Sequence, residues 1–272
     1  MNARSALFDL YGDHLRSRGG AARVASLVAL MAPLAITAPA VRTAVSRMVK
    51  QGWLRPVRID GAAGYSLTPR AEHRLDNAAA RIYRTTAREE WDGYWHLIIP
   101  DRPADRATRE RLRSALAYLG YAPLGDGTWL AARPSPELDD LLQSERITAE
   151  GFLARHQDDD AALIRRAWDL DAVGRSYRRW LTEAKDLVDT LPAAPADEEV
   201  FAVRSRLVHE WRKFLFTDPG LPRALLPGDW PGDEAAAFFD AEAARLLPAS
   251  ARFVDACLVI ARNDRHLNGV RP

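Results

Sequence analysis

The chain has few of the features that mark a secreted, disulfide-linked protein. Its 272 residues include one cysteine, Cys257, so no disulfide can form within the chain, as is usual for proteins of the reducing cytoplasm. Cys257 lies in an apolar run, and we expect it to be a buried small hydrophobic residue. Because Asp9 and Asp13 interrupt the first apolar segment, we expect no signal peptide and a cytoplasmic protein.

Membrane spans and common catalytic motifs are also missing from the sequence. The uncharged stretch 24–41 is interrupted by Pro33 and Pro39 and is shorter than the ~20 residues that a span needs. No Walker loop, dinucleotide fingerprint or nucleophile elbow is present. His209 and Glu210 resemble the start of a zinc-protease helix, but residue 213 is lysine and not the second histidine. We therefore predict no catalytic residues, no metal, no cofactor and no membrane partner.

Charge is balanced over the whole chain but not along it. The net formal charge is +1, yet residues 1–90 hold 14 Lys and Arg against 7 Asp and Glu, whereas the remainder holds 24 against 30. A basic head on an acidic body favours contact between the head and nucleic acid.

Residues 37–54 have the pattern of a DNA-recognition helix. We expect Thr37 to cap the helix through its hydroxyl, Pro39 to lie in its first turn and Gly52 to end it in a left-handed conformation. One face is apolar: Val41, Ala44, Val45 and Met48. The other face is polar and suits the major groove of DNA: Arg42, Thr43, Ser46, Arg47 and Lys50. The alternative interpretation is a solvated amphipathic helix.

The flanking segments predict a winged helix-turn-helix. Helical patterns cover 5–16 and 23–31, a turn covers 32–36, and 57–59 and 65–67 read as two strands around a loop at 60–64. Thr68 is placed to cap a further helix over 69–85. Arg55 and Arg58 are the candidates for phosphate contacts from the wing. The predicted DNA-binding domain spans residues 1–90.

The rest of the chain divides into a mixed segment and a helical segment. Strand patterns cover 94–99, 120–124, 128–132 and 146–152, and helical patterns cover 106–119 and 135–142. This β-α-β-β-α-β order predicts a ferredoxin-like domain over residues 91–158, which is a candidate region for dimer contacts. Residues 159–272 read as helices over 163–188 (interrupted at Gly174), 197–216, 233–247 and 253–262. The expected fold class is α+β and mainly helical.

Residues 207–232 combine aromatic rings, charges and four prolines in an unusual density. We interpret this stretch as one wall of a ligand pocket, in which Arg212 would meet an anion. The candidate effector-binding residues are His209, Glu210, Trp211, Arg212 and Trp230. The alternative is a rigid packed corner that contains buried ion pairs.

Three of these stretches resemble the PaaX family of repressors of phenylacetic-acid degradation. They are LFDLYGDHLRSRGG at 7–20, VRTAVSRMVKQGWL at 41–54 with YSLT at 65–68, and HEWRKFLFTDPGLPRALLPGDWPG at 209–232. The resemblance implies an N-terminal winged helix, a central Cas2-like ferredoxin domain and a C-terminal helical domain. It also implies a homodimer on a palindromic double-stranded DNA operator, released by an aryl- or acyl-CoA thioester such as phenylacetyl-CoA.

Two other functions remain open at the level of sequence. The C-terminal domain could act on a CoA thioester as a hydrolase or transferase, although no nucleophile motif supports this. A Cas2-like central domain could also process nucleic acid. In that case Asp101, which follows the first predicted strand, would be the aspartate expected near the end of that strand.

Overall fold

The computed structural model describes residues 1–83 and 90–263, with side chains up to residue 259. It has two compact units, and the C-terminal helices contribute to both. The first unit comprises Met1–Thr86, Trp180–Arg212 and Ala235–Pro272, and the second comprises Ala87–Arg179 and Lys213–Glu234. Helices predominate, and the strands form two small sheets, so the α+β, mainly helical fold class is confirmed.

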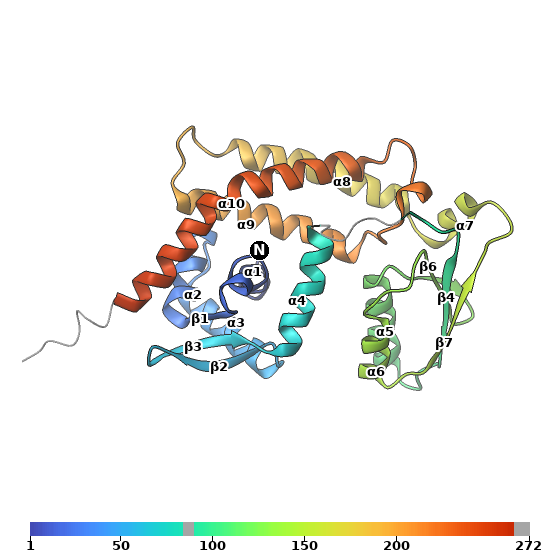
Figure 1. The fold of residues 1–272 in the computed structure, drawn as a ribbon, viewed down its shortest axis with the longest axis horizontal. Coiled ribbons are helices and arrows are strands. Elements are labelled where there is room, and N and C mark those ends of the chain that lie inside the picture. Colours follow the sequence, from blue (N-terminus) through green and yellow to red (C-terminus); the bar gives the residue numbers. More distant parts are fainter. Residues whose placement is uncertain (84–89, 264–272) are drawn as a thin grey trace, which may run out of the picture. The chain divides into compact units, whose positions relative to one another are not determined.

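The first unit begins with a winged helix-turn-helix (Figure 1). Its elements in chain order are α1 (Ala3–Leu10), a π-helical turn (Tyr11–Leu15), β1 (Ala21–Arg23), α2 (Val24–Met31), α3 (Ala38–Lys50), β2 (Leu54–Ile59), β3 (Ala62–Leu67) and α4 (Pro69–Ile82). The strands form an antiparallel sheet in the order β1-β3-β2. Residues 24–34 and 38–50 meet at 120°, an angle typical of a helix-turn-helix.

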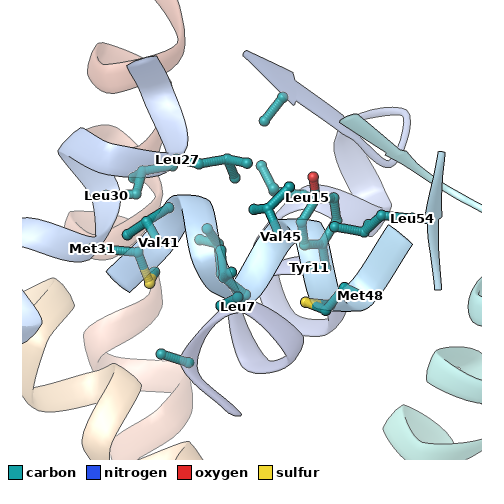
Figure 2. Close-up of a cluster of buried hydrophobic side chains, with 14 of the residues drawn as sticks. Leu7, Tyr11, Leu15, Leu27, Leu30, Met31, Val41, Val45, Met48 and Leu54 are labelled. Atoms are coloured by element: carbon teal, nitrogen blue, oxygen red, sulfur yellow. The ribbon is translucent and has the colours of Figure 1, made fainter. Parts of the chain in front are cut away.

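The core of the winged helix contains the apolar stripe predicted for α3. We call α1 and the π-helical turn that follows it (residues 3–15) the α1 segment. Figure 2 shows Val41, Val45 and Met48 of α3 packed with side chains from three other segments: Leu7, Tyr11 and Leu15 of the α1 segment, Leu27, Leu30 and Met31 of α2, and Leu54 of β2. The same hydrophobic cluster includes Phe201 of α9 (Asp197–Trp211) and Val254 and Cys257 of α10 (Pro231–Asn263). The head therefore shares one core with C-terminal helices, and Cys257 is buried as expected.

The prediction for the start of α3 was wrong, whereas the prediction for its end is confirmed. Thr37 occupies the N-cap position, but its side chain makes no capping hydrogen bond, so that prediction was wrong. Gly52 has φ +72°, as predicted. Its amide donates to the Val49 carbonyl at 3.0 Å, and the Trp53 amide donates to the Met48 carbonyl at 2.9 Å. These two bonds form a Schellman motif.

The wing is a tighter hairpin than predicted. Asp60 and Gly61, with φ +46° and +73°, form a two-residue turn between strands that run to Ile59 and start at Ala62. The five-residue loop predicted at 60–64 was wrong, because an Asp-Gly pair can by itself reverse the chain. Thr68 caps α4 as predicted. The predicted continuation of this helix to residue 85 extends into 84–89, outside the described residues.

The second unit contains the predicted ferredoxin-like arrangement. Its elements are β4 (Trp95–Pro100), α5 (Arg106–Tyr118), β5 (Ala122–Gly125), β6 (Thr128–Ala131), α6 (Leu138–Glu145) and β7 (Ala149–Ala154). The strands pair antiparallel in the order β5-β6-β4-β7. Helices α5 and α6 cover the face that carries Ile98 (Figure 1). Residues of α7 (Asp160–Ala167) contact Trp95 on the other face.

Two predicted helix boundaries in the C-terminal region were wrong. The break placed at Gly174 lies instead at Trp168, between α7 and α8 (Leu170–Asp189). The helices predicted over 233–247 and 253–262 form one helix, α10, with Pro248 inside it. Figure 1 shows α10 bent, as a proline within a helix requires because its ring displaces a carbonyl one turn earlier. The predicted helix over 197–216 is α9 followed by a 3-10 turn (Arg212–Phe216).

Among the described helices, none by itself has the length and apolar composition of a membrane span. Only Val24–Leu34 and Ala38–Lys50 taken together reach that composition, and they are bent sharply against each other.

Candidate nucleic-acid interface

The polar face of α3 is presented to solvent. The side chains on this face are all exposed: Arg42, Thr43, Ser46, Arg47 and Lys50. Their apolar neighbours on the opposite face are buried. Within the described parts of the chain, Arg42, Arg47 and Lys50 make no hydrogen bond or ion pair through their side chains. Uncompensated cations on an exposed helix are suited to contacts with phosphates and guanine edges.

The wing carries two exposed arginines and one acid. Arg55 Nε donates to the Leu67 carbonyl at 3.5 Å, and Arg58 Nη1 donates to the Gly61 carbonyl at 3.0 Å. Arg55 and Arg58 lie three residues apart on β2, so their side chains leave opposite faces of the hairpin. At the tip, Asp60 forms an ion pair with the buried Arg23. The wing therefore offers less uncompensated positive charge than α3 does.

Two carboxylates of the α1 segment bind cations from α9 and the turn after it. Asp9 accepts from His209 Nδ1 at 2.7 Å, and Arg212 Nε lies 2.5 Å from its other oxygen. Asp13 pairs with Arg204 and accepts a hydrogen bond from the Tyr83 hydroxyl. We call these the Asp9 and Asp13 ion pairs. They join segments about two hundred residues apart in sequence, and local patterns gave no signal for Asp9, Asp13, Arg204 or Tyr83.

Burial and nearby charges shift the pKa values of the ionisable groups in and beside these ion pairs. Burial raises the pKa of Asp9 above its ordinary value, although His209 and Arg212 act in the opposite direction. Burial opposes ionisation of Asp13 as well, but Arg204, assisted by His14, holds the pKa of that carboxyl below its usual value. The pKa of His14 is lowered to about 4, chiefly because the ring is buried. His14 is therefore neutral at pH 7.

The predicted effector-binding residues lie in three different environments. His209 and Arg212 both contact Asp9. Trp211 is buried, stacks on Phe239 with ring centroids 4.7 Å apart, and donates its indole N–H to the Ile82 carbonyl at 3.3 Å. Glu210 is half-buried on α9.

Trp230 belongs to the second compact unit. There it is buried and lies edge-on to Tyr177, with ring centroids 5.9 Å apart. Within the first unit, the structure thus brings His209 and Arg212 together on one carboxylate.

A small cavity lies beside the Asp9 and Asp13 ion pairs. Its volume is about 10 Å³, close to the minimum for one water molecule. The lining residues come from the α1 segment, from the end of α2 and the turn after it, and from α9, and they include Asp9, Asp13, His14, Phe201 and Ser205. Nδ1 of His14, one of the lining residues, is buried and has no hydrogen-bond partner among the described residues.

Asp101 follows β4 in the ferredoxin-like domain. Its carboxylate accepts a hydrogen bond from the Thr148 hydroxyl, and its amide donates to the Thr148 carbonyl at 2.8 Å. In the described ranges, no group of three or more His, Cys, Asp or Glu residues is arranged to hold a metal ion. The contacts of Asp101 connect β4 to the start of β7.

These features define a winged-helix DNA-binding protein with a central ferredoxin-like domain. Three family models match the chain: PaaX-like protein over residues 2–71, PaaX protein central Cas2-like domain over 88–163, and PaaX-like protein C-terminal domain over 168–256. The chain is 31% identical over 267 residues to the transcriptional repressor PaaX of Escherichia coli (strain K12), covering 93% of this chain and 83% of that protein. The chain belongs to the PaaX family of transcriptional repressors, and its role is regulatory rather than enzymatic.

A solved structure has a similar fold. It is the uncharacterized protein Rv0674 from Mycobacterium tuberculosis, which is 28% identical, covers 94% of this chain and 98% of its own, and gives a TM-score of 0.59.

Proposed function

We propose that the protein is a ligand-responsive repressor that acts in the cytoplasm. It binds a palindromic DNA operator as a homodimer and releases the operator when it binds an aryl- or acyl-CoA thioester such as phenylacetyl-CoA. The observation that carries the DNA-binding role is the exposed, uncompensated polar face of α3 beside a wing. The effector class and the dimer rest on family resemblance.

In this proposal α3 enters the major groove and reads the operator. Arg42 and Arg47 reach base edges or phosphates, and Thr43, Ser46 and Lys50 make the contacts that position the helix. Two copies of α3 in a symmetric dimer would read half-sites about one helical turn of DNA apart. The wing contributes through Arg55 or Arg58.

The Asp9 ion pairs offer a route from effector to DNA. Asp9 belongs to α1, whose Leu7 is buried against the α3 stripe (Figure 2). An anionic group of the effector that took the place of Asp9 at His209 and Arg212 would detach α9 from α1 and so alter the support of α3. A ligand can release DNA only by as much as it prefers the incompetent state, typically about 1–3 kcal/mol.

The test measures operator affinity with and without a panel of acyl- and aryl-CoA thioesters, after bound genomic sites have been mapped. We expect at least one thioester to weaken operator binding, and we expect Arg212→Ala to lose that response. Arg252→Ala is the matched control, because it removes an arginine from an exposed ion pair with Asp197. We expect this variant to respond as the parent does.

Each failure has a separate meaning. A protein that shows no preference for any genomic site would contradict the repressor role. Operator affinity that is indifferent to every thioester would contradict the effector class. A full response in Arg212→Ala would leave the effector class in place and contradict the proposed role of the Asp9 ion pairs.

A further inference from the structure

An arginine–aromatic stack lies on the surface of the winged helix. The Arg4 guanidinium lies over the Phe8 ring, 5.6 Å from its centroid, and the Arg70 guanidinium lies over Trp53 at 5.5 Å. Phe8 and Trp53 meet edge to face, with centroids 4.9 Å apart and planes at 82°. The two rings therefore lie between the two cations, in the order Arg4, Phe8, Trp53, Arg70. These residues come from α1, from the segment after α3 and from the first turn of α4.

The backbone fixes this stack at the C-terminal end of α3. Trp53 is the residue whose amide closes the Schellman motif on Met48. The Thr68 hydroxyl donates to the Gly52 carbonyl at 2.7 Å, so α4 begins beside the point where α3 ends. Arg70 is the second residue of α4, and the exposed Lys50 is the last residue of α3. The stack therefore adjoins the end of the candidate reading helix.

Neither arginine of the stack is neutralised. Arg4 and Arg70 are exposed, and in the described portion of the chain neither makes an ion pair or hydrogen bond through its side chain. Nearby arginines differ, since Arg16 pairs with Asp76 and Arg18 with Asp255. A guanidinium held against a ring keeps its in-plane N–H groups available, and their fork matches the oxygens of a phosphate. The half-buried rings restrict where that fork can point.

We propose that the stack formed by Arg4, Phe8, Trp53 and Arg70 binds the phosphate backbone of duplex DNA beside the groove that α3 occupies. This inference rests on the proposed DNA-binding function and adds a second contact region to it. The ligand is a backbone phosphate rather than a base, because the two guanidiniums belong to α1 and α4 and not to the polar face of α3 that enters the groove. The contact therefore adds affinity without selecting a sequence.

The experiment compares Arg4→Gln and Arg70→Gln with the parent protein in salt titrations of DNA affinity. Each variant is titrated against the operator and against a duplex of mixed sequence. Arg206→Gln is the matched control, because Arg206 is an exposed arginine of α9 in the same unit and its replacement changes the net charge equally. Arg70→Lys keeps the charge but lacks the planar fork. Thermal unfolding shows whether each variant is folded.

We expect Arg4→Gln and Arg70→Gln each to reduce the slope of log affinity against log salt by about 0.9 for each DNA phosphate that is no longer neutralised. Binding to both duplexes should weaken by the same factor, so that the preference for the operator is unchanged. Arg206→Gln should have the parental slope, and Arg70→Lys should reduce the slope less than Arg70→Gln does. Should one of the glutamine variants not fold, the other one and Arg70→Lys carry the comparison.

Parental slopes in folded Arg4→Gln and Arg70→Gln would overturn the phosphate site while leaving the DNA-binding role intact. Weakening confined to the operator would also overturn it, because that pattern indicates base contacts. A parent protein that binds neither duplex at low salt would remove the proposed function and this site together.

Discussion

The charges of Asp13 and Arg204 are buried, yet each has several polar partners. Arg204 donates through Nε to the Ala243 carbonyl at 3.0 Å and through another nitrogen to Asp13, which also accepts from the Tyr83 hydroxyl. Removing one partner of such a pair typically costs about 3–5 kcal/mol, since the other charge is left buried and unpaired. These partners belong to four segments of the first unit, so the network selects one arrangement of head and C-terminal helices.

His14, beside this network, should make stability depend on pH. The ring is 1% exposed and has a pKa of about 4, lowered first by burial and then by Arg204 and Arg18, against the opposing charges of Asp13 and Asp255. In the unfolded chain the pKa returns to about 6.5. The unfolded state then binds the proton more tightly, so the free energy of unfolding falls by up to about 3 kcal/mol between pH 6.5 and 4.

Denaturant unfolding of the parent and of His14→Gln at several pH values measures this effect. Glutamine keeps a polar group near Arg204 but does not titrate. Because Asp9 and Asp13 remain in both proteins, the difference between the two pH profiles isolates His14. Parallel profiles between pH 6.5 and 4 would show that His14 is not the group responsible.

Helix α3 was predictable because all of its determinants are local. Val41, Val45 and Met48 recur at helical spacing, and Gly52 ends the helix in the conformation that its missing side chain permits. Gly174 and Pro248 misled the prediction because packing and neighbouring residues override local preference. At Gly174, an added Cβ would come within 3.4 Å of Pro231. After Pro248, the Ser250 hydroxyl donates to the Leu246 carbonyl at 2.9 Å within the bent helix.

The candidate site was predictable only in part, for a related reason. Exposure along one helix follows from periodicity, so the α3 residues could be named from sequence. The pairing of Asp9 with His209 and Arg212, and that of Trp53 with Arg70, depend on how distant segments meet. No local pattern encodes those meetings. The sequence did indicate buried ion pairs around residue 210, but it did not indicate the partner.

Substitutions on the two faces of α3 should change different properties: DNA affinity on the polar face and stability on the apolar face. Arg47→Ala should weaken operator binding by about 1–3 kcal/mol if Arg47 reads a base, and leave stability unchanged. Met48→Ala, one position along, should lower the free energy of unfolding by about 2–5 kcal/mol because Met48 is fully buried. Gel shifts and denaturant unfolding on both variants make the comparison. Operator affinity at the parental level in folded Arg47→Ala would remove Arg47 from the reading face.

At the scale of the whole molecule, the first compact unit builds one core from segments that are far apart in sequence. The family models divide the chain at residues 2–71, 88–163 and 168–256, whereas the first compact unit combines the head with parts of the last segment. Phe201, Val254 and Cys257 belong to the same buried cluster as Leu7 and Leu27. Ser26 also donates its hydroxyl hydrogen to the Cys257 carbonyl at 3.1 Å. The C-terminal helices are therefore structural partners of the reading head.

A fragment of residues 1–90 should accordingly be much less stable than the head within the full chain. Truncation removes Phe201 and Val254 from the core, and burial of such side chains contributes about 1.5–3 kcal/mol each. It also removes Arg204 from Asp13 and His209 and Arg212 from Asp9. Small domains are stable by only about 5–15 kcal/mol, so we expect a large drop in the denaturant midpoint, measured by circular dichroism.

The control is a full chain carrying a protease site between residues 86 and 88, cleaved after folding. All the buried contacts of the first unit remain after this cut, so the two pieces should stay associated and keep the parental midpoint. A fragment 1–90 that unfolds at the parental midpoint, or a cleaved head that separates and remains folded, would show that the shared core does not support the head. An effector acting at α9 would then need another route to α3.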